Sequence, residues 1–169
     1  MRGFRTEPDG TVSAELTIDE VAILLDLTSQ FSELLRQRPA GDEAIDRLLP
    51  DAYPDDASAS AEFRRFTSDG LVDRKLATAG ILLESIRVAV AESTAAGATG
   101  EQATVLRLDA AAAQSWLTAI GDLRLTIASR LGIEEDGDGG APGEAMTEVY
   151  DWLGFVQGSL VDALDGDQP

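Results

Sequence analysis

The hydrophobic positions along the chain form the same pattern twice. Residues 11–35 and 103–127 each begin with alternating apolar and polar side chains, continue through Leu-Thr or Leu-Asp, and end in an amphipathic stretch. With an offset of 92 residues, Leu16 aligns with Leu108 and Leu24 with Trp116. Alternation predicts a half-buried strand, and apolar positions every three or four residues predict a helix. The chain therefore contains two strand–cap–helix units, although two unrelated amphipathic helices could also match by chance.

Turn and capping residues mark the boundaries of the first unit. The Pro-Asp-Gly sequence at 8–10 is typical of a turn and predicts a hairpin over 2–16. Thr17 and Glu20 have the spacing of a capping box, in which each side chain binds the backbone N–H of the other residue. We therefore expect a helix over 18–38.

The same signals predict the remaining elements. A third strand is expected over 103–108, and further helices over 42–49, 57–66, 69–92, 110–131 and 145–164. The apolar face of the helix over 69–92 is predicted to consist of Val72, Leu76, Ala79, Leu83, Ile86 and Val90. We predict a single, predominantly helical α+β domain over 1–164, with about six helices and a small three-stranded antiparallel sheet. Residues 165–169 are expected to form a disordered tail.

Charge narrows the range of functions. The 169 residues include 31 acidic and 13 basic side chains, so the net charge is −18. A surface this acidic repels phosphate backbones and anionic lipids, so we expect neither nucleic-acid binding nor membrane attachment. The apolar runs are far shorter than the about 20 residues that span a bilayer, and the N-terminal segment lacks a signal peptide's apolar stretch. We expect a cytoplasmic protein.

The chain contains no His and no Cys. It therefore lacks the commonest zinc ligands, a Ser-His-Asp relay and a thiol nucleophile. The acidic loop at 134–144 departs from the EF-hand pattern, and no P-loop sequence occurs. We expect no cofactor, and the lack of a recognisable active-site motif favours a protein that is not an enzyme.

Basic side chains concentrate in one short segment. Four of the thirteen lie within twelve positions: Arg64, Arg65, Arg74 and Lys75. On so acidic a protein, this basic cluster could bind an acidic partner or a phosphate group. Ion pairs with carboxylates of the same chain are the common alternative, and they need no function.

Carboxylates gather in the preceding connector, at Asp51, Asp55, Asp56 and Glu62. Three carboxylates could hold magnesium, or two could divide the roles of general acid and base. In the simpler interpretation, Asp55 and Asp56 stabilise the N-terminus of the helix over 57–66 through its dipole.

Several segments resemble, in this order, an uncharacterised actinobacterial family catalogued as a domain of unknown function. They are MRGFR, LLPDAYPDD, AEFRRFTSDGL followed by Lys75-Leu76, LRLD with WLTAIGDLRLTIASRLGI, and VYDWLGFVQGSLV. The similarity covers nearly the whole chain except 93–102 and 134–144. Genes of this family commonly lie beside the gene for the ClpS adaptor, and near genes for a JAMM-type metallopeptidase and cysteine synthesis. Some members are labelled transcriptional regulators. The resemblance implies no catalytic residues, but it implies a regulatory role near proteolysis.

These observations favour a non-enzymatic regulatory or protein-interaction module with a protein partner. A carboxylate-dependent metal-binding protein or enzyme, and a transcriptional regulator, are the alternatives. A homodimer is a further hypothesis, because the edge strands of a small sheet invite pairing with another chain. The segment 42–76 lies outside the repeated pattern, so we expect the function there.

Overall fold

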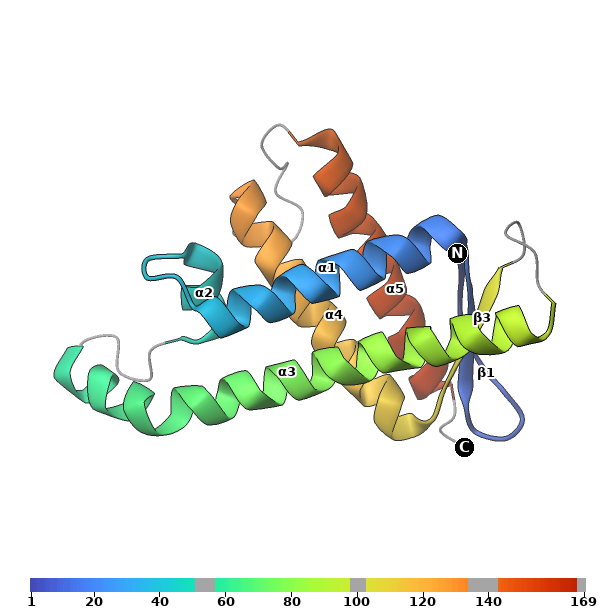
Figure 1. Cartoon of the computed structure of the whole chain (residues 1–169), viewed down its shortest axis with the longest axis horizontal. Helices are drawn as coiled ribbons and strands as arrows, with labels where there is room; N and C mark the ends of the chain where they lie inside the picture. Colours follow the sequence, from blue (N-terminus) through green and yellow to red (C-terminus); the bar gives the residue numbers. More distant parts are fainter. Residues whose placement is uncertain (51–56, 98–102, 134–142, 167–169) are drawn as a thin grey trace.

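Five helices and one three-stranded sheet form the described part of this computed structural model (Figure 1). It describes residues 1–50, 57–97, 103–133 and 143–166, without the side chains of 57–68 and 144. In chain order the elements are β1 (Arg2–Thr6), β2 (Val12–Leu16), α1 (Ile18–Gln37), α2 (Glu43–Leu48), α3 (Ala57–Ala95), β3 (Thr104–Leu108), α4 (Ala110–Leu131) and α5 (Glu144–Asp165). The predicted helix-dominated α+β fold is confirmed.

The sheet has the order β1-β2-β3, and both pairings are antiparallel. The predicted hairpin joins β1 to β2, so β2 is the central strand. Alternate residues of β2 and β3 point into the core, where Ala14 and Leu106 are fully buried and Leu16 is 1% exposed. The alternation in the sequence therefore reports the buried face of the sheet correctly.

One edge of this sheet is covered by α5. The backbone N–H of Phe4 in β1 donates a hydrogen bond to Ser159 Oγ at 3.2 Å. The hydroxyl of Thr6 donates to the carbonyl oxygen of Ala163 at 2.6 Å. An edge strand whose polar groups bind a helix of the same chain is a poorer template for another chain. The homodimer stays a prediction, and the contacts with α5 disfavour pairing through β1.

Capping residues begin α1 and α4 and end α4, as their sequence signals predict. Thr17 and Glu20 form the complete capping box of α1. The carboxylate of Asp109 accepts a hydrogen bond from the backbone N–H of Ala112 at 2.8 Å, which caps α4. Gly132 ends α4 in the left-handed conformation, with φ 68°. These local signals act within one helical turn, which is why the sequence alone reveals them.

The predicted break between helices over 57–66 and 69–92 is wrong, because α3 runs without interruption from Ala57 to Ala95. Thr67 and Ser68 resemble an N-cap in sequence, but they lie inside this helix. The segment contains no proline, and an interior glycine such as Gly70 costs a helix only about 1 kcal/mol relative to alanine. Packing of α3 against α1, α4 and β3 outweighs so small a cost.

The buried face of α3 also differs from the prediction. Leu82 and Ala89 are buried, at 0% and 3% exposure, whereas Val90 is 36% exposed. Leu83, which the pattern placed in the core, is only partly buried. Because Leu82 and Leu83 are both apolar, as are Ala89 and Val90, the sequence did not decide which of each two is buried. The seven-residue spacing between Leu82 and Ala89 places both on the side of α3 that faces α1 and α4.

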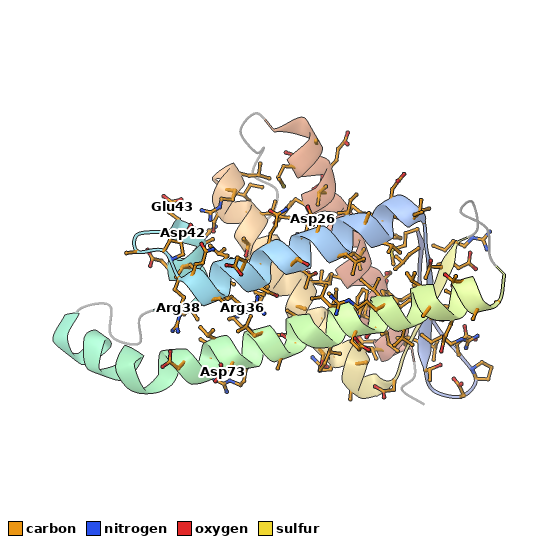
Figure 2. All side chains as sticks on the ribbon, viewed as in Figure 1. Asp26, Arg36, Arg38, Asp42, Glu43 and Asp73 are labelled. Carbon is orange, nitrogen blue, oxygen red and sulfur yellow. The ribbon has the colours of Figure 1, made fainter. Side chains whose placement is uncertain are left out.

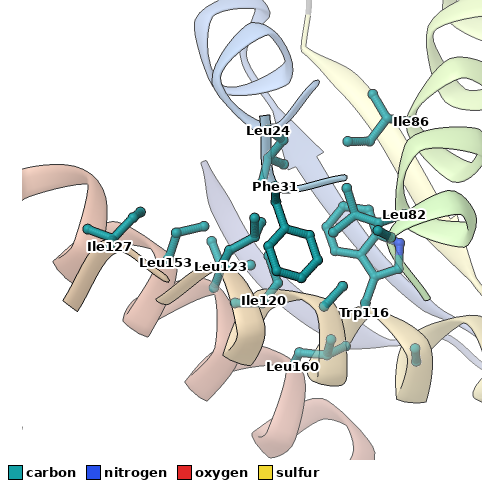
Figure 3. Packing of buried hydrophobic residues seen from close by; sticks show 14 of the residues in the cluster. Leu24, Phe31, Leu82, Ile86, Trp116, Ile120, Leu123, Ile127, Leu153 and Leu160 are labelled. Atoms are coloured by element: carbon teal, nitrogen blue, oxygen red, sulfur yellow. The ribbon is translucent and has the colours of Figure 1, made fainter. Parts of the chain in front are cut away.

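Helix α4 lies at the centre of the molecule and packs against α2, α3 and α5. Its Trp116 is fully buried, and Phe4 of β1 meets the indole edge-on, with ring centroids 5.9 Å apart. Figure 3 shows Leu24 of α1 and Leu82 of α3 packed around the same core. The core therefore joins the sheet to the four long helices.

Candidate functional site

Lys75, a member of the predicted basic cluster, is engaged inside the molecule. Its Nζ lies 2.6 Å from Asp122 Oδ1, so the ion pair joins α3 to α4. The two side chains are only 14% and 11% exposed. Lys75 is the single lysine of the chain. At this position it links α3 to α4 and is not an exposed docking group.

The structure does not test the rest of the basic cluster. Arg74 is exposed on α3. Arg64 and Arg65 belong to the same helix, but their side chains lie outside the described residues. A binding surface formed by these arginines therefore stays a prediction.

The predicted carboxylate set is not tested either. Asp51, Asp55 and Asp56 lie outside the described residues, and so does the side chain of Glu62. Within the part of the chain that is described, no three carboxylates converge as a metal site would require. The metal-binding alternative stays a prediction that concerns this connector alone.

The described surface contains an apolar groove between α1, α4 and the first turn of α5, with a volume of about 260 Å³. We call it the α1–α4–α5 groove. Its walls are formed by Leu27, Gln30, Phe31, Leu34, Leu123, Thr126, Ile127, Arg130 and Met146. Figure 1 shows α1 crossing α4 at this level, with the upper end of α5 beside them.

The floor of the groove is part of the hydrophobic core. Phe31, Leu123 and Ile127 are 2%, 3% and 5% exposed, and they lie together in Figure 3. Met146 of α5 is 41% exposed and forms an open side of the groove. An apolar floor with a polar rim is the arrangement found at the centre of protein–protein interfaces.

Two hydrogen-bonded pairs stand at the rim. Gln30 Nε2 donates to Asp26 Oδ2 at 2.7 Å, which holds the exposed carboxylate of Asp26 beside the groove. Arg130 donates to Asp42 Oδ2 at 2.6 Å and so joins α4 to the cap of α2. The hydrogen bond from Arg130 lowers the pKa of Asp42; it and the bonds from the backbone N–H groups of the first turn of α2 outweigh the desolvation that raises the pKa. The guanidinium of Arg130 is thereby paired with a carboxylate of the same chain.

Sequence reasoning missed this groove, although one signal was present. Leu27 and Leu34 extend the apolar face of α1 beyond the residues that one core contact needs, and both are only partly buried. A face wider than its partner helix leaves apolar surface at its margin. The contribution of Met146 had no comparable signal, because it depends on where α5 lies.

The described helices include none with the length and apolar character of a membrane span. No solved structure matches the chain.

Comparison with known proteins places the chain among actinobacterial relatives. It is 31% identical over 149 residues to the "Oxidative stress regulator AosR" of Mycobacterium tuberculosis. The protein of the same name from Mycobacterium bovis has the same identity over the same length. The alignment covers 78% of this chain but 62% of either relative, so the chain spans less than two thirds of their length. A family model described as "Domain of unknown function (DUF2017)" matches residues 1–164, and the chain therefore belongs to the DUF2017 family.

Proposed function

We propose that this protein is a non-enzymatic, cytoplasmic regulatory module that acts by binding another protein through the α1–α4–α5 groove. The observation that carries the proposal is the groove's apolar floor, which opens to solvent on a chain of net charge −18. A concave apolar floor with a polar rim on a strongly charged protein is a feature of interaction sites.

The size of the groove favours a protein partner over a small molecule. Its volume of about 260 Å³ lies below the roughly 300–1,000 Å³ of pockets that enclose drug-sized ligands. A hollow of this size accepts a few apolar side chains of a partner. The surrounding rim would then exclude water, as it does around the anchoring residues of known interfaces.

The relatives support a regulatory role. Their name, oxidative stress regulator, describes control of a response rather than a chemical reaction. The present chain contains no Cys, so it cannot respond to oxidants through a thiol of its own. We therefore propose that it regulates by binding, and that any thiol chemistry lies elsewhere.

Affinity purification from the organism that encodes the protein tests this proposal. Met146→Glu places a charge in the groove, and Val161→Glu is the matched control. Both residues lie on α5, at 41% and 39% exposure, and Val161 does not line the groove. We expect a stoichiometric protein partner to be retained by the wild type and by Val161→Glu, and to be lost with Met146→Glu. Circular dichroism should show unchanged helix content in both variants.

Retention of the same partner by Met146→Glu would remove the groove from the function. Loss of the partner by both variants would indicate a general effect of acidic charge on α5, and it would count equally against the groove.

A further inference from the structure

We infer that the occupant of the α1–α4–α5 groove is a basic amphipathic helix of the partner protein. This inference rests on the proposed function, and it adds the chemistry of the bound segment.

The α1 wall of the groove is acidic, and the end of α5 beside the groove adds negative charge. Helix α1 carries four carboxylates and one arginine, a net charge of −3. Only the first turn of α5 reaches the groove, through Met146, and this end of the helix carries Glu148 and Asp151 and no basic residue. An apolar groove beside an acidic helix selects a ligand whose apolar face is flanked by Lys or Arg, because opposite charges steer and align the partner.

Asp26 brings this charge to the edge of the apolar floor. Its side chain is exposed, and the hydrogen bond from Gln30, a wall residue, fixes it there. Within the described residues, no salt bridge engages Asp26, whereas Arg130 on the opposite wall is engaged by Asp42. Asp26 is therefore a carboxylate that a partner's cation can reach without breaking an internal pair.

The shape of the groove favours a helix. Its walls are helices, and Leu27, Phe31 and Leu34 follow one another along α1 at spacings of four and three. A partner helix with apolar residues at the same spacings can lay them along this row. A second copy of this chain would bring the same acidic α1 wall to the groove, so charge repulsion disfavours self-association there.

A synthetic peptide provides the test. The probe is a fluorescein-labelled amphipathic helix of about 18 residues, with Leu at helical spacing and Lys or Arg on its other faces. The matched probe replaces every Lys and Arg by Glu. Fluorescence anisotropy measures the dissociation constant at low and moderate salt. We expect the basic probe to bind, to weaken as salt screens the charges, and the acidic probe not to bind.

Two protein variants locate the site. Asp26→Lys and Asp73→Lys change the net charge by the same amount, and both residues are exposed. Figure 2 shows Asp26 on α1 and Asp73 on α3. We expect Asp26→Lys to raise the dissociation constant about tenfold and Asp73→Lys by less than about threefold. Amide chemical shifts should move at Leu27, Leu34 and Met146.

Equal weakening by the two lysine variants would overturn the inference, because the probe would then sense only net charge. Binding of the acidic probe with similar affinity would overturn it as well. Failure of the peptide tests leaves the proposed function intact if the native partner is still lost with Met146→Glu. The proposed function fails separately if Met146→Glu retains the native partner in the affinity purification.

Discussion

Ala14 lies directly opposite Leu106 in the sheet, and these two residues are also equivalent positions of the internal repeat, 92 residues apart. The register on either side is reciprocal, pairing Val12 with Leu108 and Leu16 with Thr104. The first residue of each strand thus faces the last residue of its counterpart. The strand pair therefore has the register of a local two-fold axis that passes between Ala14 and Leu106.

The likeness continues into the helices. Thr17 caps α1 and Asp109 caps α4, in each case through the backbone N–H three residues further on. Five buried positions of α1 correspond, at the same offset, to buried positions of α4: Val21 to Ala113, Leu24 to Trp116, Thr28 to Ile120, Phe31 to Leu123 and Leu35 to Ile127. The two units thus share strand, cap and buried face.

Removal of the internal ion pair should destabilise the fold. Lys75→Ala leaves the carboxylate of Asp122 nearly buried without its cation, and breaking such a pair costs about 3 kcal/mol of unfolding free energy. Arg74→Ala, at the exposed neighbouring position, should change it by less than about 0.5 kcal/mol. Urea unfolding followed by circular dichroism measures both. A loss below about 1 kcal/mol for Lys75→Ala would show that the pair contributes little.

Asp42 should make the stability depend on pH. Its folded pKa is lowered, chiefly by the hydrogen bond from Arg130, so it lies below the unfolded pKa. The ionised carboxylate therefore contributes stability that is present above the unfolded pKa of about 3.9 and is lost as the pH falls through the folded pKa. Asp42→Asn can still cap α2 but cannot ionise. The difference in unfolding free energy between wild type and variant should shrink between pH 6 and pH 3; a constant difference would exclude this origin.

Glycine at position 38 should relieve backbone strain at the end of α1. It ends α1 in the left-handed region, with φ 43°, where a side chain is strained. Its guanidinium lies 2.7 Å from Asp69, but that carboxylate is 74% exposed and the pair is weak. Arg38→Ala and Arg38→Gly both remove the pair, and only glycine relieves the strain. We expect Arg38→Gly to be more stable than Arg38→Ala by about 1 kcal/mol in urea unfolding; equal stabilities would show that the backbone is not strained.

Met146 should be the methionine that oxidants reach. Hydrogen peroxide transfers one oxygen atom to the thioether, which gives the sulfoxide and water. Met146 is 41% exposed, whereas Met1 is partly buried against the core. Peptide mass spectrometry should find the added oxygen on Met146 first.

The sulfoxide is polar, so the oxidised protein should bind the basic probe more weakly. Met146→Leu keeps the groove apolar and should bind the probe equally well before and after peroxide treatment. A similar loss of binding in Met146→Leu would place the damage outside the groove.

Local signals were sufficient for most of the fold. The capping box at Thr17, the turn at 8–10 and the left-handed Gly132 each act over a few residues, so their effect is written in adjacent positions. The alternation around Ala14 even identified the buried face of the sheet. Two signals in α3 misled: Thr67 resembles an N-cap but lies inside the helix, and the apolar pattern placed Leu83 rather than Leu82 in the core.

The candidate site could not be predicted in the same way. The sequence left open whether Lys75 binds a partner or pairs with a carboxylate of its own chain, because its partner Asp122 lies 47 residues further along the chain. The groove needs the relative positions of α1, α4 and α5, and no local pattern specifies how far apart three helices stand. The one sequence signal for the groove was the width of the apolar face of α1, which Leu27 and Leu34 extend beyond the residues that one core contact needs.

The sequence by itself determined most of the elements, the caps of α1 and α4, the doubled strand–helix unit and the absence of histidine and cysteine chemistry. The tertiary structure decided that Leu82 rather than Leu83 enters the core, that Lys75 pairs internally, and that an apolar groove stays open beside Met146. The physical reason is the distance along the chain over which each kind of interaction acts. Backbone hydrogen bonds and caps are settled within a turn or a strand pair, whereas burial and ion pairing depend on which distant surfaces meet.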